Sequence, residues 1–265
     1  MNEYSWLALA AGNSRLHWGW FKHHTLVDTW DSPHISNAIK PDQLPQLFFS
    51  SNLIKQGVFD VPIYLASVVS HQTERWQNYH QLNLVNLSDI KLTNLYPTIG
   101  VDRALAVWGA IAIYDRSCLV IDGGTALTFT GANQQGQLIG GAILPGLRSQ
   151  LLTLKDKTSA LPEVELPNSL PPRWALDTDT AIASGVLYTA ISGVYNYILD
   201  WLKQFPDSPI VFTGGDGKLL LSLLHQQFPD LSVQATVEPH LVFQGIKLVY
   251  AQKILNKFIF NLYLN

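Results

Sequence analysis

Residues 118–132 read CLVIDGGTALTFTGA, an apolar run that turns on Gly-Gly-Thr and continues as a second apolar run. Two short runs of this kind, joined by a tight turn, are typical of an antiparallel hairpin. A third apolar run follows after another polar turn. We therefore expect three consecutive strands, at Cys118 to Asp122, Ala126 to Ala132 and Gln137 to Leu144.

The same pattern occurs at the start of the chain. Apolar runs separated by polar turns indicate strands at Trp6 to Ala11, Leu16 to Phe21 and Leu26 to Trp30. When the two patterns are superposed, residues 10–14 (AAGNS) align with residues 122–126 (DGGTA), an offset of 122 − 10 = 112 residues. This repeat predicts a diverged duplication of one βββαβα unit.

Helices and single strands alternate after each set of three strands. The expected helices are 41–49, 71–81, 104–113, 177–204, one that follows Gly215, and 241–258; the expected strands are 63–69, 84–87 and 209–213. Such alternation is typical of an α/β protein. We expect two duplicated halves, residues 1–115 and 116–265, with a cleft between them.

The composition favours an intracellular enzyme or binding protein. Hydrophobic residues make up 47% of the chain and charged residues 14%, which supplies a large core and excludes disorder. The net charge, 17 − 20 = −3, gives no reason to expect nucleic acid or an anionic membrane as a partner. The single cysteine cannot form an intrachain disulfide. Polar residues interrupt the longest apolar stretch, residues 180–202, so we expect no membrane span.

Each half contains a hairpin turn that combines glycine with a small polar side chain. Backbone N–H groups in a glycine turn can approach phosphate oxygens closely, and hydroxyl groups add donors. Both turns therefore suit phosphate binding, although ordinary hairpin turns would have the same spacing. Neither GxxxxGK[ST] nor GxGxxG occurs, and HExxH and GxSxG are also absent. The sequence therefore gives no support for a P-loop or Rossmann nucleotide site, or for a metallopeptidase or serine hydrolase.

The segment Gly100-Val101-Asp102-Arg103 places an acid and an arginine at the start of an apolar helix. The positive helix end and the guanidinium are expected to keep Asp102 ionised near neutral pH. Asp102 is a candidate general base for a hydroxyl nucleophile, and Arg103 a candidate ligand for an anionic substrate group. The alternative is a helix cap with a surface ion pair.

Asp122 ends a strand that is expected to be buried, where an unpaired carboxylate is costly. It needs a cation or several hydrogen-bond donors. Because Gly123, Gly124 and Thr125 follow directly, Asp122 is a candidate metal or monovalent-cation ligand beside a phosphate site. The alternative is an Asx-type turn within the hairpin.

Six motifs in order resemble the type III pantothenate kinase family. They are GNS at 12–14, GVDR at 100–103, DGGTALT at 122–128, GGAILPG at 140–146, DTDTAIASG at 177–185 and TGG at 213–215. The match runs from residue 6 to about Gly245. The resemblance implies an actin-like fold of two ribonuclease-H-like halves and a cytoplasmic homodimer. It also implies ATP-dependent phosphorylation of pantothenate, the first step toward coenzyme A, with Mg²⁺ and a monovalent cation, K⁺ or NH₄⁺.

The resemblance also implies roles for individual residues. Asp102 corresponds to the general base and Asp122 to the monovalent-cation ligand. The pantothenate site corresponds to Tyr96, Gly100, Val101, Asp102, Arg103 and Thr178. The ATP site corresponds to Ala10, Ala11, Gly12, Asn13, Ser14, Arg15, Leu16, His17 and Thr125.

Two positions depart from the family pattern. Asp177 replaces the usual Asn, and Ala10 stands where the first motif begins with Asp. The internal repeat makes the same point, because the partner position of Ala10 in the second half is Asp122. Loss of that carboxylate is expected to weaken placement of the Mg²⁺ complex of ATP. The alternative function is therefore a catalytically weakened pantothenate- or nucleotide-binding regulatory relative. A sugar or acetate kinase of the same superfold is a third reading.

Overall fold

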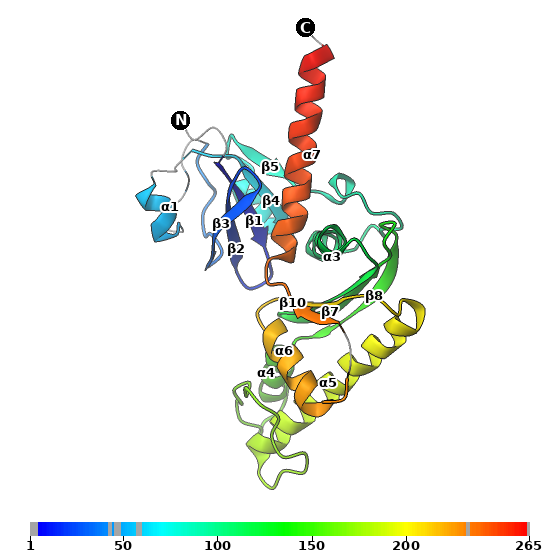
Figure 1. Ribbon diagram of the computed structural model, residues 1–265. Coiled ribbons are helices and arrows are strands. Elements are labelled where there is room, and N and C mark those ends of the chain that lie inside the picture. The colour runs from blue at the N-terminus through cyan, green and yellow to red at the C-terminus, as the bar shows by residue number, and fades with distance from the viewer. Residues whose placement is uncertain (1–4, 42–43, 45–48, 57–59, 232–233, 264–265) are drawn as a thin grey trace. The chain divides into compact units, whose positions relative to one another are not determined.

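The computed structural model describes the chain except for residues 1–4, 42–43, 45–48, 57–59, 232–233 and 264–265 (Figure 1). The chain forms two compact units, one of residues 1–109 with 241–265 and the other of residues 110–240. This grouping puts the last helix with the first unit. The division into repeat halves at residue 115 stays a prediction from the sequence.

The first unit is built on a five-stranded mixed sheet with the strand order β3-β2-β1-β4-β5. β1 pairs antiparallel with β2 and parallel with β4. The strands are β1 (Ser5–Ala11), β2 (Leu16–Lys22), β3 (Thr25–Ser32), β4 (Ile63–Ser67) and β5 (Leu82–Leu84).

The second unit repeats this topology in the strand order β10-β9-β6-β7-β8. Its strands are β6 (Cys118–Gly123), β7 (Ala126–Ala132), β8 (Leu138–Pro145), β9 (Ile210–Thr213) and β10 (Ala235–Val237). β6 pairs antiparallel with β7 and parallel with β9, as β1 does with β2 and β4. The expected α/β duplication with a meander in each unit is confirmed.

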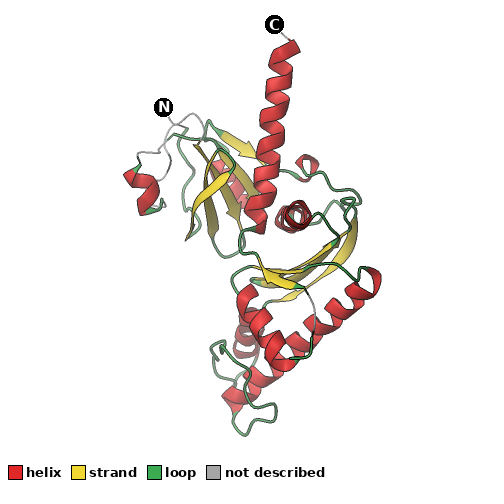
Figure 2. Cartoon of the chain, viewed as in Figure 1, coloured by secondary structure: helices red, strands yellow, loops and turns green. Residues whose placement is uncertain are grey.

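Helices complete the two units (Figure 2). The first unit contains α1 (Ser51–Lys55), α2 (Ser70–Trp76), most of α3 (Val101–Tyr114), α7 (Leu241–Tyr263) and a 3-10 helix (Leu87–Asp89). The second contains α4 (Leu147–Lys157), α5 (Thr178–Gln204) and α6 (Gly217–Gln227). All three helices of the second unit lie on the same face of its sheet (Figure 1).

Several elements differ from the sequence-based expectations. The helix expected at 41–49 falls mostly outside the described residues, α2 stops at Trp76 instead of 81, and β5 lies at 82–84 instead of 84–87. Helix α4 and strand β10 were not expected. The periodic apolar signal of α4 is weak, because only Leu147 and Leu151 of its eleven residues are buried. Strand β10 has only three residues.

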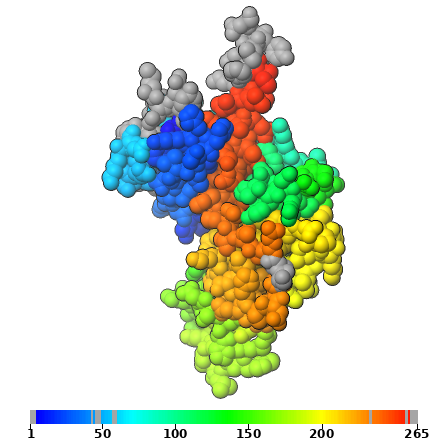
Figure 3. Space-filling model, viewed as in Figure 1, coloured from blue at the N-terminus to red at the C-terminus, as the bar shows by residue number. Residues whose placement is uncertain are grey.

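The sheet of the first unit is covered by aromatic side chains on both faces. On one face the Trp18 ring meets the Trp76 ring edge-on at 5.5 Å. On the other face the Trp6 ring is stacked between Phe21 and Tyr250, at centroid distances of 4.2 and 4.3 Å. These ring contacts fix α2 and α7 to opposite faces of the sheet. Helix α7 extends past the sheet of its unit (Figure 1). In the space-filling view the orange part of α7 lies against the blue residues of the first sheet (Figure 3).

Helix α5 forms the centre of the second unit's core. Its buried residues include Leu187, Ile191, Val194 and Ile198, which pack with the sheet and with α6. By length and composition α5 could span a membrane, and it is the one such helix among the described residues. Half of its most apolar window is buried within the protein. Packing of α5 against the sheet and α6 of its unit accounts for the apolar character of this helix.

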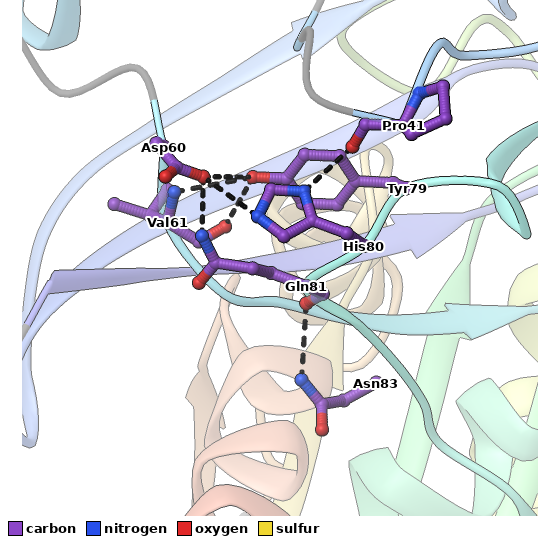
Figure 4. A network of polar contacts seen from close by, with 7 residues as sticks. All are labelled: Pro41, Asp60, Val61, Tyr79, His80, Gln81 and Asn83. Atoms are coloured by element: carbon purple, nitrogen blue, oxygen red, sulfur yellow. Dashed lines mark hydrogen bonds and ion pairs between the residues drawn. The ribbon is translucent and has the colours of Figure 1, made fainter.

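A polar network fastens the start of β4 to the connection between α2 and β5 (Figure 4). The Asp60 carboxylate accepts hydrogen bonds from the Tyr79 hydroxyl at 3.5 Å and from the Gln81 side-chain amide, and His80 Nε2 lies 3.4 Å away. His80 Nδ1 lies 2.7 Å from the Pro41 carbonyl oxygen. Burial raises the pKa of the Tyr79 hydroxyl to about 12. This network is at the opposite end of β4 from the candidate site described below.

Helices α3 and α7 of the first unit cross with their backbones in contact. A Cβ atom on Gly109 would lie 2.6 Å from the Leu241 carbonyl oxygen, and one on Gly245 would lie 2.4 Å from the Leu105 carbonyl oxygen. Real Cβ atoms do not approach other atoms so closely, so each helix accepts only glycine at the crossing. The crossing fixes the position of α3, whose first turn carries Asp102.

Replacing Gly245 by alanine is expected to destabilise the protein by about 1–3 kcal/mol, because the added methyl group separates two packed helices. Gly193→Ala in α5 is the matched control, since its Cβ would meet nothing within 4 Å. The control should raise stability by about 0.5–1 kcal/mol through the better helix propensity of alanine. Chemical denaturation of both variants measures the two effects. Equal stability of the two variants would show that α3 and α7 are not in close contact.

Candidate active site

The first glycine turn connects β1 to β2. The Gly12 N–H donates to the Arg15 carbonyl at 3.1 Å and so closes the turn. His34 Nε2 lies 2.8 Å from the Gly12 carbonyl oxygen and holds the turn from the side. The exposed members of the turn are Asn13, Ser14 and Arg15, and the buried residues on either side are Ala11 and Leu16. The loop thus offers exposed backbone and side-chain donors, as a phosphate site requires.

Three charged or ionisable side chains stand beside this turn. Arg15 Nη1 donates to Asp31 Oδ2 at 3.0 Å, and His17 Nδ1 lies 2.7 Å from Asp31 Oδ1. All three side chains are about half exposed. Asp31, at the edge of the sheet on β3, was not among the residues singled out from the sequence. Nothing in the sequence pairs it with Arg15 and His17, because the pairing depends on strand register.

The position of Ala10 in the first sheet matches that of Asp122 in the second. Ala10 pairs with His17 on β2 and with Ala66 on β4. Asp122 pairs with Thr128 on β7 and with Thr213 on β9. Both are one residue before the end of the central strand, and each is the single residue of its strand that is not fully buried. The second unit therefore carries a carboxylate where the first carries a methyl group.

Asp102 lies in the first turn of α3. The Arg103 N–H donates to Asp102 Oδ1 at 2.7 Å, and a Cβ on Gly100 would lie 2.5 Å from the same oxygen. Burial raises the pKa of the Asp102 carboxyl above its ordinary value, although the Arg103 N–H and the guanidinium charge both lower it. The two lowering effects expected from the sequence are present, but desolvation outweighs them. A carboxylate with a raised pKa is a stronger base.

Arg103 and Tyr96 meet beside Asp102. Arg103 Nη1 donates to the Tyr96 hydroxyl at 3.0 Å, and Arg103 is buried while Tyr96 is exposed. The Val101 side chain is buried, so this residue can reach a ligand only through its backbone. The structure therefore brings Tyr96 and the Gly100 to Arg103 segment together, as the sequence motif suggested.

The Asp102 segment lies close to the first glycine turn within the same unit. The Val68 N–H, just after β4, donates to the Ala11 carbonyl at 3.1 Å. Val68 Cγ1 is 3.7 Å from the Cβ position of Gly100. Val68 thus bridges the end of β1 and the residue before α3. One short contact chain connects the candidate phosphate turn to the candidate base.

The second glycine turn, residues 123–125, lies at the start of two helices of its own unit. The Thr125 carbonyl accepts from the Gly146 N–H at 2.9 Å and from the Ser149 hydroxyl at 2.7 Å, at the start of α4. The Asp216 N–H, before α6, donates to the Gly123 carbonyl at 2.8 Å. Because helix N-termini favour anions, the surroundings of the turn suit phosphate. The Gly-rich motifs at 140–146 and 213–215 thus meet the DGGT turn.

The Asp122 carboxylate depends on glycine at position 214. A Cβ on Gly214 would lie 2.2 Å from Asp122 Oδ1 and 2.6 Å from the Gly123 carbonyl oxygen. Gly214 also has a positive φ of +79°, which favours glycine. A carboxylate and a carbonyl oxygen converge here, and oxygen is the ligand type that hard cations prefer. Among the described residues, no three His, Cys, Asp or Glu side chains gather as a metal site.

Helix α4 contributes a cation that sequence reasoning missed. Arg148, in the first turn of α4, lies 3.3 Å from Asp216 Oδ1 through both Nε and Nη2. Its side chain is 68% exposed, whereas that of Asp216 is 10% exposed, so a guanidinium is held at the edge of the phosphate turn. The signal that was overlooked is a basic residue two positions after Gly146, the N-cap residue of α4.

Thr178 lies on a different element, at the exposed start of α5. Asp177 caps this helix by accepting from the Thr180 N–H at 2.8 Å. This hydrogen bond lowers the pKa of the Asp177 carboxyl. The preceding Trp174 and Leu176 side chains are 88% and 103% exposed. Asp177 therefore has a capping role in place of the Asn expected from the family pattern.

Comparison with solved structures shows the fold. A Campylobacter jejuni protein described as a Baf family transcriptional activator matches with a TM-score of 0.60 at 20% identity, over 93% of this chain and 98% of that chain. The activator of 2-hydroxyisocaproyl-CoA dehydratase from Clostridium difficile, with bound ADPNP, matches with a TM-score of 0.53 at 11% identity, over 97% of each chain. The duplicated five-stranded sheets are those of the actin-like ATPase fold.

Comparison with known sequences shows the family. The family model described as type III pantothenate kinase matches residues 6–200. A type III pantothenate kinase from Nostoc sp. is 42% identical over 94% of this chain and 95% of its own length. Another from Synechocystis sp. is 45% identical over 92% of this chain and 90% of its own length. With these matches and with the GVDR and DGGT segments at the start of α3 and the end of β6, the chain belongs to the type III pantothenate kinase family.

Proposed function

We propose that the chain transfers the γ-phosphoryl group of ATP to the terminal hydroxyl of pantothenate with Asp102 as the general base. The observation that carries this role is a partly buried carboxylate with a raised pKa beside Arg103 and Tyr96. The hydroxyl oxygen attacks the γ-phosphorus, its proton passes to the Asp102 carboxylate, and ADP leaves. Phosphoryl transfer needs mainly positioning and charge neutralisation, which named residues can supply.

Arg103 is proposed to bind the pantothenate carboxylate. It is buried, and its Nη1 is oriented by the Tyr96 hydroxyl, so the guanidinium is held in one place. A fixed guanidinium binds a carboxylate well because its geometry matches the two carboxylate oxygens. Further proposed pantothenate contacts are the backbone groups of Gly100 and Val101 and the residue Thr178.

Residues 10–17 at the first glycine turn are proposed to bind the ATP phosphates, and Thr125 in the second glycine turn is a further proposed phosphate contact. Arg148 adds positive charge at the second turn. Asp122 and the Gly123 carbonyl are proposed to hold K⁺ or NH₄⁺, because both oxygens converge beside Gly214. Bound with ATP, Mg²⁺ would neutralise phosphate charge while keeping much of its hydration shell, which agrees with the small number of carboxylates present.

Ala10 supports one alternative, a weakened pantothenate- or nucleotide-binding relative with a regulatory role. In that reading the chain binds ATP but turns it over slowly. An assay that follows ADP release with pantothenate, sugars and acetate as separate acceptors distinguishes the readings. ADP release with pantothenate, but not with sugars or acetate, supports a pantothenate kinase. ATP binding without turnover of any acceptor would support the weakened relative instead.

The assembly is proposed to be a cytoplasmic homodimer. Support comes from large apolar side chains that the second unit exposes, such as Trp174, Leu176 and Ile143. Exposed apolar groups of this size are typical of interaction surfaces.

Asp102→Asn is expected to lower kcat by about 10²-fold or more, because the hydroxyl proton loses its acceptor. In the parent protein, kcat/KM should fall as the pH decreases through the raised pKa of Asp102. The expected signature in the variant is retained ATP binding with lost turnover. Turnover near that of the parent would exclude Asp102 as the base.

The same substitution should not destabilise the fold at neutral pH. A carboxyl whose pKa is higher in the folded state favours folding when protonated, and this stability is lost as the pH rises through the folded-state pKa. Asparagine removes the buried charge and can still accept from the Arg103 N–H. The free energy of unfolding at pH 7 should therefore equal or exceed that of the parent. A marked loss of stability would mean that Asp102 is structural.

Activity is expected to rise when Na⁺ is replaced by K⁺ or NH₄⁺ at matched ionic strength. Asp122→Asn should abolish the difference, since it removes the charged ligand. Asp200→Asn, on the exposed surface of α5, is a matched control that should keep the K⁺ response. Equal rates of the parent in all three salts would contradict the cation site.

Trp174→Asp is expected to shift the protein toward the monomer, because it places a charge on an exposed apolar site. Light scattering coupled to size-exclusion chromatography measures the mass of parent and variant. Val27→Asp, at an exposed position on β3 of the first unit, is the control. A parent that is monomeric at micromolar concentration would contradict the dimer.

A further inference from the structure

A row of four residues crosses the first sheet at the level of the phosphate turn. Strand register places Asp31 opposite His17, His17 opposite Ala10, and Ala10 opposite Ala66. Directly paired residues of neighbouring strands point to the same face of a sheet. Asp31 and His17 therefore share the face onto which a carboxylate at residue 10 would project.

The contact between Asp31 and His17 determines how the imidazole is presented. His17 Nδ1 lies 2.7 Å from Asp31 Oδ1. A carboxylate oxygen accepts, so Nδ1 carries the proton, and in the neutral ring Nε2 is then an acceptor. The Nε2 edge lies toward the turn, because a Cβ on Gly12 would be 3.8 Å from Nε2. The pair thus directs a hydrogen-bond acceptor to the phosphate turn.

The second unit lacks this arrangement. Thr128 is the residue equivalent to His17, and it pairs with Ile143, which is equivalent to Asp31. There the carboxylate is on the central strand itself, as Asp122. Each unit therefore has a hydrogen-bond acceptor near the carboxyl end of its central strand. In the first unit the acceptor is His17 on the neighbouring strand β2, and in the second it is Asp122 on the central strand β6.

We propose that the Asp31–His17 pair replaces the carboxylate that residue 10 lacks, with His17 Nε2 accepting a hydrogen bond from the hydration shell of Mg²⁺ that accompanies ATP. This inference rests on the proposed kinase function for the presence of Mg²⁺ and ATP at the first turn. His17 is the group that faces the nucleotide. Asp31 is a positioning residue that fixes the tautomer and the ring. Mg²⁺ suits such a contact, because it dehydrates reluctantly and keeps several waters.

Nucleotide binding in the absence of pantothenate tests the pair. Calorimetry with a non-hydrolysable β,γ-imido analogue of ATP, with Mg²⁺ and with EDTA, gives the factor by which Mg²⁺ tightens binding. His17→Ala should reduce this factor about tenfold or more, and the readout is the ratio of the affinities with Mg²⁺ and with EDTA. His24→Ala, which removes an exposed imidazole from the turn between β2 and β3, should behave like the parent.

Two further variants sharpen the test. Asp31→Ala should also reduce the Mg²⁺ factor. This substitution also releases Arg15 from its ion pair, so the nucleotide affinity in EDTA can change as well. The readout is therefore the ratio of the affinities with Mg²⁺ and with EDTA. Ala10→Asp combined with His17→Ala should restore the Mg²⁺ factor, since the carboxylate then projects from β1. Asp31 is exposed at the sheet edge, so Asp31→Ala gives the same readout if His17→Ala does not fold.

The outcomes separate this inference from the proposed function. If His17→Ala keeps the full Mg²⁺ factor, or if Ala10→Asp fails to restore it in that background, the pair does not replace the carboxylate. If the parent shows the expected Mg²⁺ pattern but does not phosphorylate pantothenate, the proposed function fails and the role of the pair stands. If the parent phosphorylates pantothenate but His17→Ala keeps the full Mg²⁺ factor, the proposed role of the Asp31–His17 pair is wrong and the proposed kinase function stands.

Discussion

The burial of the two central strands on both faces is the constraint on which the rest of the molecule depends. β1 and β6 each have one residue that is not fully buried, and the two residues, Ala10 and Asp122, are equivalent in the repeated sheets. At these two positions a side chain is not fully buried, whereas a charged side chain further back along the strand would lie in the core. Both glycine turns follow at the carboxyl ends of these strands.

Close backbone approach at the turns determines which residues can occupy the positions around them. Gly214 gives space to the Asp122 carboxylate, and Gly100 gives space to that of Asp102. In the first unit the glycine crossing of α3 and α7 fixes the helix that presents Asp102. Asp102 is then both held and desolvated, and the raised pKa that results suits a base better than a fully solvated carboxylate would. The same packing that positions the group adjusts its chemistry.

Much of this organisation was predictable from the residues. The sequence predicted the two sets of three strands, which are related by an offset of 112 residues, and it predicted helix α5. These elements have strong local patterns, because buried strands and helices are long apolar runs with regular spacing. The GVDR and DGGT segments were also recognisable from local sequence. Helix α4 was missed because few of its side chains are buried, and Arg148 was missed with it. The end of α2 was misplaced because the Tyr79 to Gln81 network, not a local stop signal, organises the chain after Trp76.

The sequence by itself determined the duplicated α/β architecture, the location of the glycine turns and the absence of a carboxylate at residue 10, since all of these are local or periodic properties of the chain. Only the tertiary structure decided two further matters. Desolvation outweighs the helix end and the guanidinium at Asp102, because burial depends on residues far away in the chain. His17 and Asp31 come to lie beside Ala10 because register across three strands, which no local pattern encodes, aligns them.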